Sequence, residues 1–258
     1  MSAVPSCVAF VPARAGSARV PGKNVRLFAG HPLIAYTIAS ALDAGCFSSV
    51  VVSTDDAATA EIARYYGASV PFLRPASLAG GRSPDIEWVD HALVALEKSG
   101  DAFDSFAILR PTSPFRTVET IRRAWAVFRR AKGVDSLRAV ERVSQHPGKM
   151  WMIRGDRLLP LLPFGPSEQP WHSSQMPALP EVWVQNASLE IAWTRVVSET
   201  RTIAGSTLVP FVTEGHEGFD INEQADWWLA EELVRQGEVV LPDIVRLPFS
   251  RQSLNSGS

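Results

Sequence analysis

The sequence predicts an α/β fold built on a mostly parallel sheet. The first indication is that short apolar runs alternate with amphipathic stretches at the spacing of strand–helix units. The second is that a polar loop follows each of three such runs, at residues 8–11, 48–53 and 105–109. The third is a proline-rich interruption at 144–181, which predicts a small inserted lobe, either a lid or a dimerisation arm. We therefore expect one doubly wound, Rossmann-like domain at 1–245 and a frayed tail at 246–258.

The individual elements follow from local patterns. The run VAFV at 8–11 has the continuous apolar character of a buried parallel strand. In the segment 32–44, Leu33, Ile34 and Ile38 repeat at helical spacing and predict an amphipathic helix. Further strands are predicted at 48–53, 69–72, 105–109, 181–193 and 207–212. Further helices are predicted at 57–66, after Ser83 as N-cap, from beyond Arg116 to about Lys132, and at 222–235.

The composition limits the classes of function. With 258 residues, of which 46% are hydrophobic and 20% charged, the chain can bury a sizeable core. A net charge of −2 argues against nucleic acid and anionic membranes as partners. Cys7 and Cys46 are the only cysteines and are expected to be small buried residues in a reducing compartment. Because MSAVPS at the start contains neither a basic segment nor a long apolar run, we expect a cytoplasmic protein without a membrane span.

The loop after the first predicted strand carries a local positive charge. It is broken by Pro12, Gly16, Pro21 and Gly22, and its cations are Arg14, Arg19, Lys23 and Arg26. Open α/β sheets bind ligands at the carboxyl ends of strands, and free N–H groups with several cations suit a polyphosphate. The alternative is an exposed basic loop without a ligand. The loop is neither G-x-G-x-x-G nor a P-loop, because Gly16 and Gly22 are one residue too far apart and Asn24 replaces Ser or Thr.

The same segment resembles a family signature. The pattern P-A-R-x-x-S-x-x-x-P-x-K-N is matched by Pro12, Ala13, Arg14, Ser17, Pro21, Lys23 and Asn24. It is similar to that of the acylneuraminate cytidylyltransferase family, which includes CMP-sialic acid synthetases and, more distantly, CMP-Kdo synthetases. The resemblance covers about residues 7–235 and implies a nucleotidyltransferase. In such an enzyme an acidic nonulosonic-type sugar (sialic, legionaminic or pseudaminic acid-like) attacks CTP and releases pyrophosphate, with Mg²⁺ as cofactor and a homodimer as the assembly.

The resemblance implies a nucleotide site on the first loop and two later segments. Its expected residues are Ala13, Arg14, Ser17, Arg19, Lys23, Asn24, Arg74 and Ser83. Arg14 and Lys23 are expected to be catalytic together with Asp220, and Lys23 to stabilise the leaving pyrophosphate. Arg74, in the segment FLRP, is expected near the base, where a guanidinium can donate to a ring carbonyl. Gly80, Gly81 and Arg82 depart from the family pattern. The backbone N–H groups of 80–83 are expected to meet the base edge, within a base-binding region that extends over 80–85.

Two further segments resemble the sugar-binding part of the family. The segment LRPTSPFR at 109–116 is similar to L-Q-P-T-S-P-x-R, with Arg110 in place of the glutamine that faces the sugar. We hypothesise that Arg110 pairs with the sugar carboxylate and replaces a family arginine that is absent at Val184. The alternative is a structural turn closed by two prolines, which leaves the arginine unexplained. The expected sugar-binding residues are Arg110, Thr112, Ser113, Gln185 and Asn186.

The segment GFDIN at 218–222 resembles the family's D-I-D, whose two aspartates hold Mg²⁺. Asp220 is the predicted metal ligand, because magnesium often takes only one or two carboxylates beside phosphate oxygens. Asn222 is a doubtful ligand, and we favour it as the cap of the helix that follows. Asp55 and Asp56 end the second predicted strand, where the family has S-T-D, but an N-cap explains each at least as well, so neither is placed among the catalytic residues.

Other functions stay open at this point. The same fold can transfer a different nucleotide or accept a Kdo-like sugar. A non-catalytic nucleotide-sugar binding protein is an alternative of another class, and pyrophosphate release from CTP distinguishes it from the enzyme. A glycosyltransferase would want a D-x-D motif, which only Asp220 with Asn222 approximates.

Overall fold

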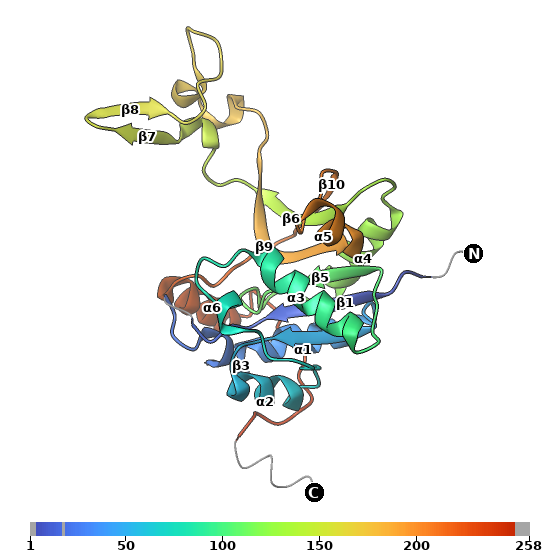
Figure 1. The fold of residues 1–258 in the computed structure, drawn as a ribbon. Coiled ribbons are helices and arrows are strands. Elements are labelled where there is room, and N and C mark those ends of the chain that lie inside the picture. The colour runs from blue at the N-terminus through green and yellow to red at the C-terminus, as the bar shows by residue number, and fades with distance from the viewer. Residues whose placement is uncertain (1–3, 17–18, 251–258) are drawn as a thin grey trace, which may run out of the picture. The chain divides into compact units, whose positions relative to one another are not determined.

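The main sheet contains six strands in the order β10-β6-β9-β5-β1-β4 (Figure 1). The computed structural model describes residues 4–16 and 19–250. The strands are β1 (Cys7–Pro12), β4 (Ser49–Ser53), β5 (Ser105–Ile108), β6 (Ser136–Arg142), β9 (Trp183–Trp193) and β10 (Leu208–Val212). Strand β1 pairs in parallel with β4 and β5, whereas β9 runs antiparallel to β5. The predicted α/β fold with a mostly parallel sheet is confirmed.

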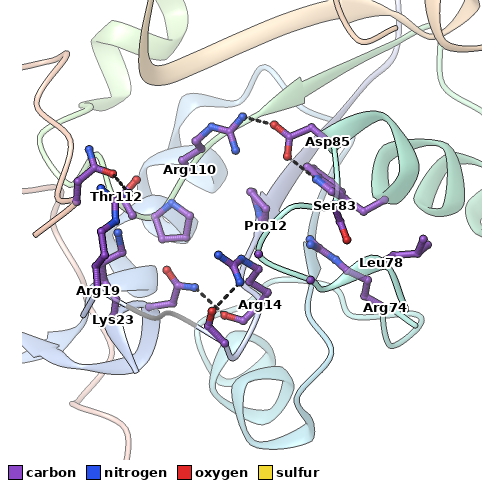
Figure 2. Close-up of a pocket in the computed structure, with 17 residues that line it drawn as sticks. Pro12, Arg14, Arg19, Lys23, Arg74, Leu78, Ser83, Asp85, Arg110 and Thr112 are labelled. Carbon is purple, nitrogen blue, oxygen red and sulfur yellow. Dashed lines mark hydrogen bonds and ion pairs between the residues drawn. The ribbon is translucent and has the colours of Figure 1, made fainter. Parts of the chain in front are cut away.

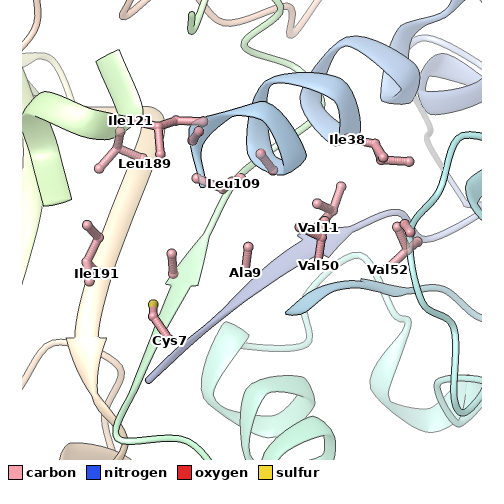
Figure 3. Close-up of a cluster of buried hydrophobic side chains, with 14 of the residues drawn as sticks. Cys7, Ala9, Val11, Ile38, Val50, Val52, Leu109, Ile121, Leu189 and Ile191 are labelled. Atoms are coloured by element: carbon pink, nitrogen blue, oxygen red, sulfur yellow. The ribbon is translucent and has the colours of Figure 1, made fainter. Parts of the chain in front are cut away.

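Helices cover both faces of this sheet. They are α1 (Leu33–Ala44), α2 (Ala57–Tyr65), α3 (Asp85–Lys98), α4 (Val118–Arg130), α5 (Thr194–Thr200) and α6 (Gln224–Gln236). On one face, Ala9 and Val11 of β1 belong to a buried cluster with side chains of α1 and α4 (Figure 3). On the other face, Val8 and Phe10 cluster with Trp88 of α3. Because successive residues of a strand point to opposite faces, β1 is buried on both sides, and this explains its unbroken apolar sequence.

Several elements differ from those expected. Residues 69–72 form only an isolated bridge, between Ser69 and Val51. Helix α3 has Pro84 at its N-cap position, so Ser83 does not cap it, and α6 begins at Gln224. Strand β6 and helix α5 were not predicted. The shorter elements are β2 (Leu27–Phe28), β3 (His31–Pro32) and 3-10 turns at Lys23–Val25, Ala76–Leu78, Pro147–Lys149, Trp171–Ser173 and Met176–Ala178.

The chain divides into two compact units, Met1–Ala139 with Asn186–Ser258, and Val140–Gln185. The proline-rich interruption predicted at 144–181 lies inside the second unit. There β7 (Trp151–Arg154) and β8 (Arg157–Pro160) form an antiparallel hairpin. Large apolar side chains are exposed on this unit: Met150, Trp151, Met152, Ile153, Leu158, Leu159, Leu161, Phe164, Met176, Trp183 and Val184. This amount of exposed apolar surface is typical of an interaction surface.

The segment after α6 returns to α2. The Tyr65 hydroxyl donates to the Leu247 carbonyl at 3.0 Å, and the Phe249 N–H donates to the Tyr66 hydroxyl at 3.1 Å. The tail predicted to be frayed from 246 is therefore bound to the first unit at residues 247 and 249, and residues 251–258 lie outside the described residues.

Candidate active site

A cavity of about 670 Å³ lies where the loops that follow β1 and β5 meet the segment between β4 and α3 (Figure 2). Its lining residues are Pro12, Arg14, Gly16, Arg19, Lys23, Asn24, Arg74, Leu78, Gly80, Gly81, Ser83, Asp85, Trp88, Arg110, Pro111, Thr112 and Asn222. These segments meet because β1, β4 and β5 are parallel neighbours, so their carboxyl ends share one edge of the sheet. Five of the described lining residues are Arg or Lys, and one, Asp85, is acidic.

The first loop presents its cations to this cavity. The Arg14 guanidinium donates through Nη1 to the Gly16 carbonyl at 2.6 Å, and the Asn24 amide donates to the Arg14 carbonyl at 3.4 Å. The loop turns at Gly22, whose φ of 63° favours glycine. Figure 2 shows Arg19, Lys23 and Thr112 on one side of the cavity and Arg74, Leu78 and Ser83 on the other, with Arg14 between them. The predicted residue Ser17 lies outside the described residues.

Lys23 and Arg19 are both attached to the segment before α6. The Lys23 ammonium donates to the Ile221 carbonyl, and Arg19 donates through Nη2 to Oδ1 of Asn222 at 3.1 Å. Burial lowers the pKa of Lys23 below its ordinary value of 10.5, against the opposing attraction of Asp220. The described structure thus brings together residues that lie some 200 positions apart in the chain.

Two residues of the first loop are placed differently from expectation. Arg26 donates to the Gln224 side chain at 2.9 Å, and its guanidinium lies 4.2 Å from the centre of the Trp227 ring, so it does not line the cavity. Ala13 is fully buried, and its N–H donates to the Ser53 carbonyl at 3.0 Å. The predicted cluster of four loop cations is therefore reduced to three, and the Ala13 amide has a protein partner.

Arg74 lines the side of the cavity opposite Arg19 and Lys23 and is almost wholly buried. Its Nε donates to the Ser53 hydroxyl and its Nη2 to the Ser53 carbonyl, both at 3.0 Å. Its guanidinium also lies 4.7 Å from the centre of the Trp88 ring. Burial lowers the pKa of Arg74 to about 10, a value at which it stays charged at neutral pH. These contacts hold a flat donor surface in one orientation against the cavity.

Arg110 is paired with protein carboxylates. Its Nη2 lies 2.5 Å from Oδ2 of Asp85 and 3.0 Å from Oε1 of Glu190, which also pairs with Arg138 (Figure 2 shows the Asp85 pair). Burial alone would raise the pKa of Asp85, but the charge and hydrogen bond of Arg110 bring it below its ordinary value. The side chains of Asp85, Arg110, Glu190 and Arg138 thus form a chain in which negative and positive charges alternate. The pairing of Arg110 with Asp85 and Glu190 was not predicted, because nothing local in the sequence marks residues 25 and 80 positions away as its partners.

The other predicted sugar-side residues are only partly brought together. Thr112 lines the cavity, and its carbonyl accepts the Ile221 N–H at 2.8 Å. Ser113 is buried and does not line the cavity. The Asn186 side chain donates to the Thr213 hydroxyl at 2.9 Å, also outside the cavity lining. Gln185 is an exposed residue of the second unit.

Asp220 has one carboxylate oxygen committed and one available. Its Oδ2 accepts from the Asn222 amide at 2.6 Å, whereas its Oδ1 is buried and has no hydrogen-bond partner among the described residues. Helix α6 is capped by Glu223 with Asp226, so the capping role predicted for Asn222 is wrong. Asp56 does cap α2, since its side chain accepts the Thr59 N–H at 2.8 Å. Over residues 4–16 and 19–250, no three His, Cys, Asp or Glu side chains gather into a metal cluster.

The fold and the cavity define an α/β protein with clustered cations around a cavity at the carboxyl edge of its sheet, a charge distribution suited to an anionic ligand. The chain matches the family described as Cytidylyltransferase over residues 8–130. It is 37% identical over 238 residues to the CMP-N,N'-diacetyllegionaminic acid synthase of Legionella pneumophila, covering 91% of this chain and 98% of that protein. It is 36% identical over 119 residues to the pseudaminic acid cytidylyltransferase of Campylobacter jejuni, covering 46% and 51% of the two chains.

Solved structures agree at the level of the fold. A CMP:2-keto-3-deoxy-manno-octonic acid synthetase complexed with CTP superposes with a TM-score of 0.64 at 15% identity, covering 90% of this chain and 99% of that one. The chain belongs to the cytidylyltransferase family and is a nucleotidyltransferase, as the segment from Pro12 to Asn24 predicted. None of the helices in the described part of the chain has the length and hydropathy of a membrane span.

Proposed function

We propose that this protein transfers CMP from CTP to an acidic nonulosonic-type sugar. The observation that carries the proposal is the 37% identity to the CMP-N,N'-diacetyllegionaminic acid synthase over nearly the full length of both chains. A legionaminic acid-like sugar is accordingly the first acceptor to test. The anomeric hydroxyl of the sugar attacks the α-phosphorus and forms an oxygen–phosphorus bond, and its proton passes to solvent water. The bond between the α-phosphorus and pyrophosphate breaks, and its electron pair stays on the departing pyrophosphate.

The cavity supports the triphosphate part of this proposal. In this assignment Arg14, Arg19 and Lys23 meet the phosphates, and Arg74 with the segment 80–83 meets the base. A cation about 4 Å from a phosphate contributes about 4 kcal/mol at an effective dielectric near 20, so three such cations are significant for binding and for the barrier. Lys23 stabilises the pyrophosphate as it departs. These residues act by position and charge and form no covalent intermediate.

The residues around Asp220 fit a magnesium ion. The buried Oδ1 of Asp220 has no partner among the described residues, and a hard cation prefers such an oxygen as ligand. Asn222 orients Asp220 by donating through Nδ2 to Oδ2, while the side-chain oxygen Oδ1 of Asn222 already accepts from Arg19. We therefore assign Mg²⁺ to Asp220 and give Asn222 a positioning role. When bound, the metal supplies charge neutralisation of the phosphates.

On the sugar side we assign Arg110 and Thr112, which both line the cavity. The ion pairs of Arg110 with Asp85 and Glu190 both use Nη2. The sugar carboxylate is proposed to meet the other edge of this guanidinium. We assign the exposed apolar surface of the second unit to a homodimer interface.

Pyrophosphate release is the direct test of this proposal. The purified protein is incubated with Mg²⁺ and each of CTP, UTP, ATP and GTP, with and without legionaminic, pseudaminic, N-acetylneuraminic or Kdo-type acids. We expect pyrophosphate and a CMP-sugar detected by mass spectrometry only with CTP and a nonulosonic acid. Binding of CTP without pyrophosphate release with any of the acids would instead indicate the non-catalytic alternative.

A further inference from the structure

The turn that ends β4 is bonded to the first loop at two points. Pro12 is in register with Ser53, so the chain segments that follow β1 and β4 run side by side. The Ala13 N–H donates to the Ser53 carbonyl at 3.0 Å, and the Ala15 N–H donates to Oδ1 of Asp55 at 2.9 Å. The backbone is therefore fixed on both sides of Arg14, the cation that lies between the two sides of the cavity in Figure 2.

We propose that Asp55 is a positioning residue that fixes the first loop for nucleotide binding by accepting the Ala15 N–H, an inference that rests on the proposed function. A carboxylate beside a polyanion site repels the ligand, so electrostatics alone disfavours Asp55 at this place. The Ala15 N–H needs an oxygen acceptor at residue 55, which either a carboxylate or an amide side chain can supply. Asp55 thus orders the loop, although its negative charge repels a polyanionic ligand.

The same turn also orients the arginine on the far side of the cavity. The Arg74 N–H donates to the Thr54 carbonyl at 2.7 Å, and the Arg74 guanidinium bonds to Ser53. Three consecutive residues, 53–55, therefore set the positions of Arg14 and Arg74 together. A pocket ordered before binding loses less conformational entropy when the ligand arrives.

Three variants test this role. Asp55→Ala removes the acceptor, and Asp55→Asn retains a carbonyl oxygen without the charge. Asp56→Ala is the matched control, since the Asp56 side chain accepts from Thr59 in the cap of α2. We expect Asp55→Ala to raise KM for CTP about tenfold and to change kcat less than about threefold. Asp55→Asn is expected to keep KM within about threefold of the wild type, and Asp56→Ala to lower Tm without changing KM.

An unchanged KM in Asp55→Ala would overturn the proposal. So would an Asp55→Asn variant as impaired as Asp55→Ala, because the charge and not the accepted bond would then matter. A lower KM in both variants would reduce Asp55 to a source of repulsion and would also overturn it.

Hydrogen exchange of the Ala15 amide, measured without nucleotide, separates this inference from the proposed function. We expect at least about tenfold faster exchange in Asp55→Ala than in Asp56→Ala. Equal exchange overturns the role of Asp55. Faster exchange in a protein that releases no pyrophosphate supports the role of Asp55 and contradicts the proposed function.

Discussion

Lys23 is the cation whose removal we expect to affect turnover most. Its ammonium lies in the cavity beside Arg14 and Arg19 and is attached to the Ile221 carbonyl. Lys23→Ala is expected to lower kcat about a hundredfold or more, the size seen when one charge-stabilising donor is lost. Steady-state pyrophosphate release measures this. Arg26→Ala is the control, because Arg26 packs on Trp227 outside the cavity lining, and unchanged turnover in Lys23→Ala would remove Lys23 from the mechanism.

The pH dependence of the same residue follows from its burial. Because burial lowers the pKa of Lys23, the charged form is lost at a lower pH than for an exposed lysine. We therefore expect kcat/KM, which reports the free enzyme, to fall as pH rises through a value below 10.5. In Lys23→Arg this fall should move to higher pH, since a guanidinium stays protonated. An alkaline limb at the same pH in both proteins would assign it to another group.

Asp220 is expected to determine the magnesium requirement. Chelation by EDTA should abolish pyrophosphate release and added Mg²⁺ restore it, because the proposed metal neutralises the phosphates. Asp220→Asn should raise the Mg²⁺ concentration for half-maximal rate about tenfold or more, since the amide oxygen is a weaker ligand. Asp101→Asn, at an exposed residue outside the cavity lining, serves as the control. An unchanged magnesium dependence in Asp220→Asn would exclude the assignment.

Arg110 links the loop after β5 to two other elements, because its ion-pair partners Asp85 and Glu190 lie in α3 and β9. If Arg110 binds the sugar carboxylate, Arg110→Gln should raise KM for the acid sugar about tenfold while leaving KM for CTP nearly constant. Separate titrations of the two substrates measure this difference. The same KM for the sugar in variant and wild type would remove Arg110 from the sugar site.

At the scale of the elements, Glu190 joins β9 to β6 and to the loop after β5. Glu190 is 3% exposed and pairs with Arg138, which is 7% exposed. Glu190→Ala leaves the buried Arg138 without this carboxylate and is expected to lower the free energy of unfolding by about 3 kcal/mol. Urea denaturation measures this loss in the free energy of unfolding, and the comparison requires that the variant and the wild type have the same m-value. Glu199→Ala breaks an exposed pair with Arg195 and should leave the free energy of unfolding nearly unchanged. An equally small effect of Glu190→Ala would contradict the prediction.

The elements with strong periodicity could be predicted, and those stabilised by distant partners could not. Strand β1 and helix α1 carry their own apolar patterns. Strand β6 has the charged residue Arg138 at a buried position. This interrupts the apolar pattern expected of a buried strand, and only the pairing with Glu190 on another strand explains it. Similarly, the cations of the first loop were visible in the sequence, whereas the contact of Arg26 with Trp227 and the bond from Ala15 to Asp55 depend on the folded chain.

For the whole molecule, the second unit carries the proposed dimer interface. Ile153 and Leu158 face each other across the β7–β8 hairpin and are 78% and 61% exposed. Replacing both with Lys should place charge in the interface and convert the dimer to a monomer, as measured by light scattering with chromatography. Val245→Lys, at a fully exposed residue of the first unit, is the control and should leave the mass unchanged. A wild-type monomer, or a variant that stays dimeric, would contradict this assignment.

The hydrogen bonds that join Tyr65 and Tyr66 to residues 247 and 249 have a consequence for biosynthesis. Their partners are separated by 182 and 183 positions in the chain. At bacterial or eukaryotic elongation rates, a ribosome needs on the order of ten seconds or more to cover that distance. Helix α2 therefore emerges early in translation without these contacts and gains them only after residues 247 and 249 have been synthesised.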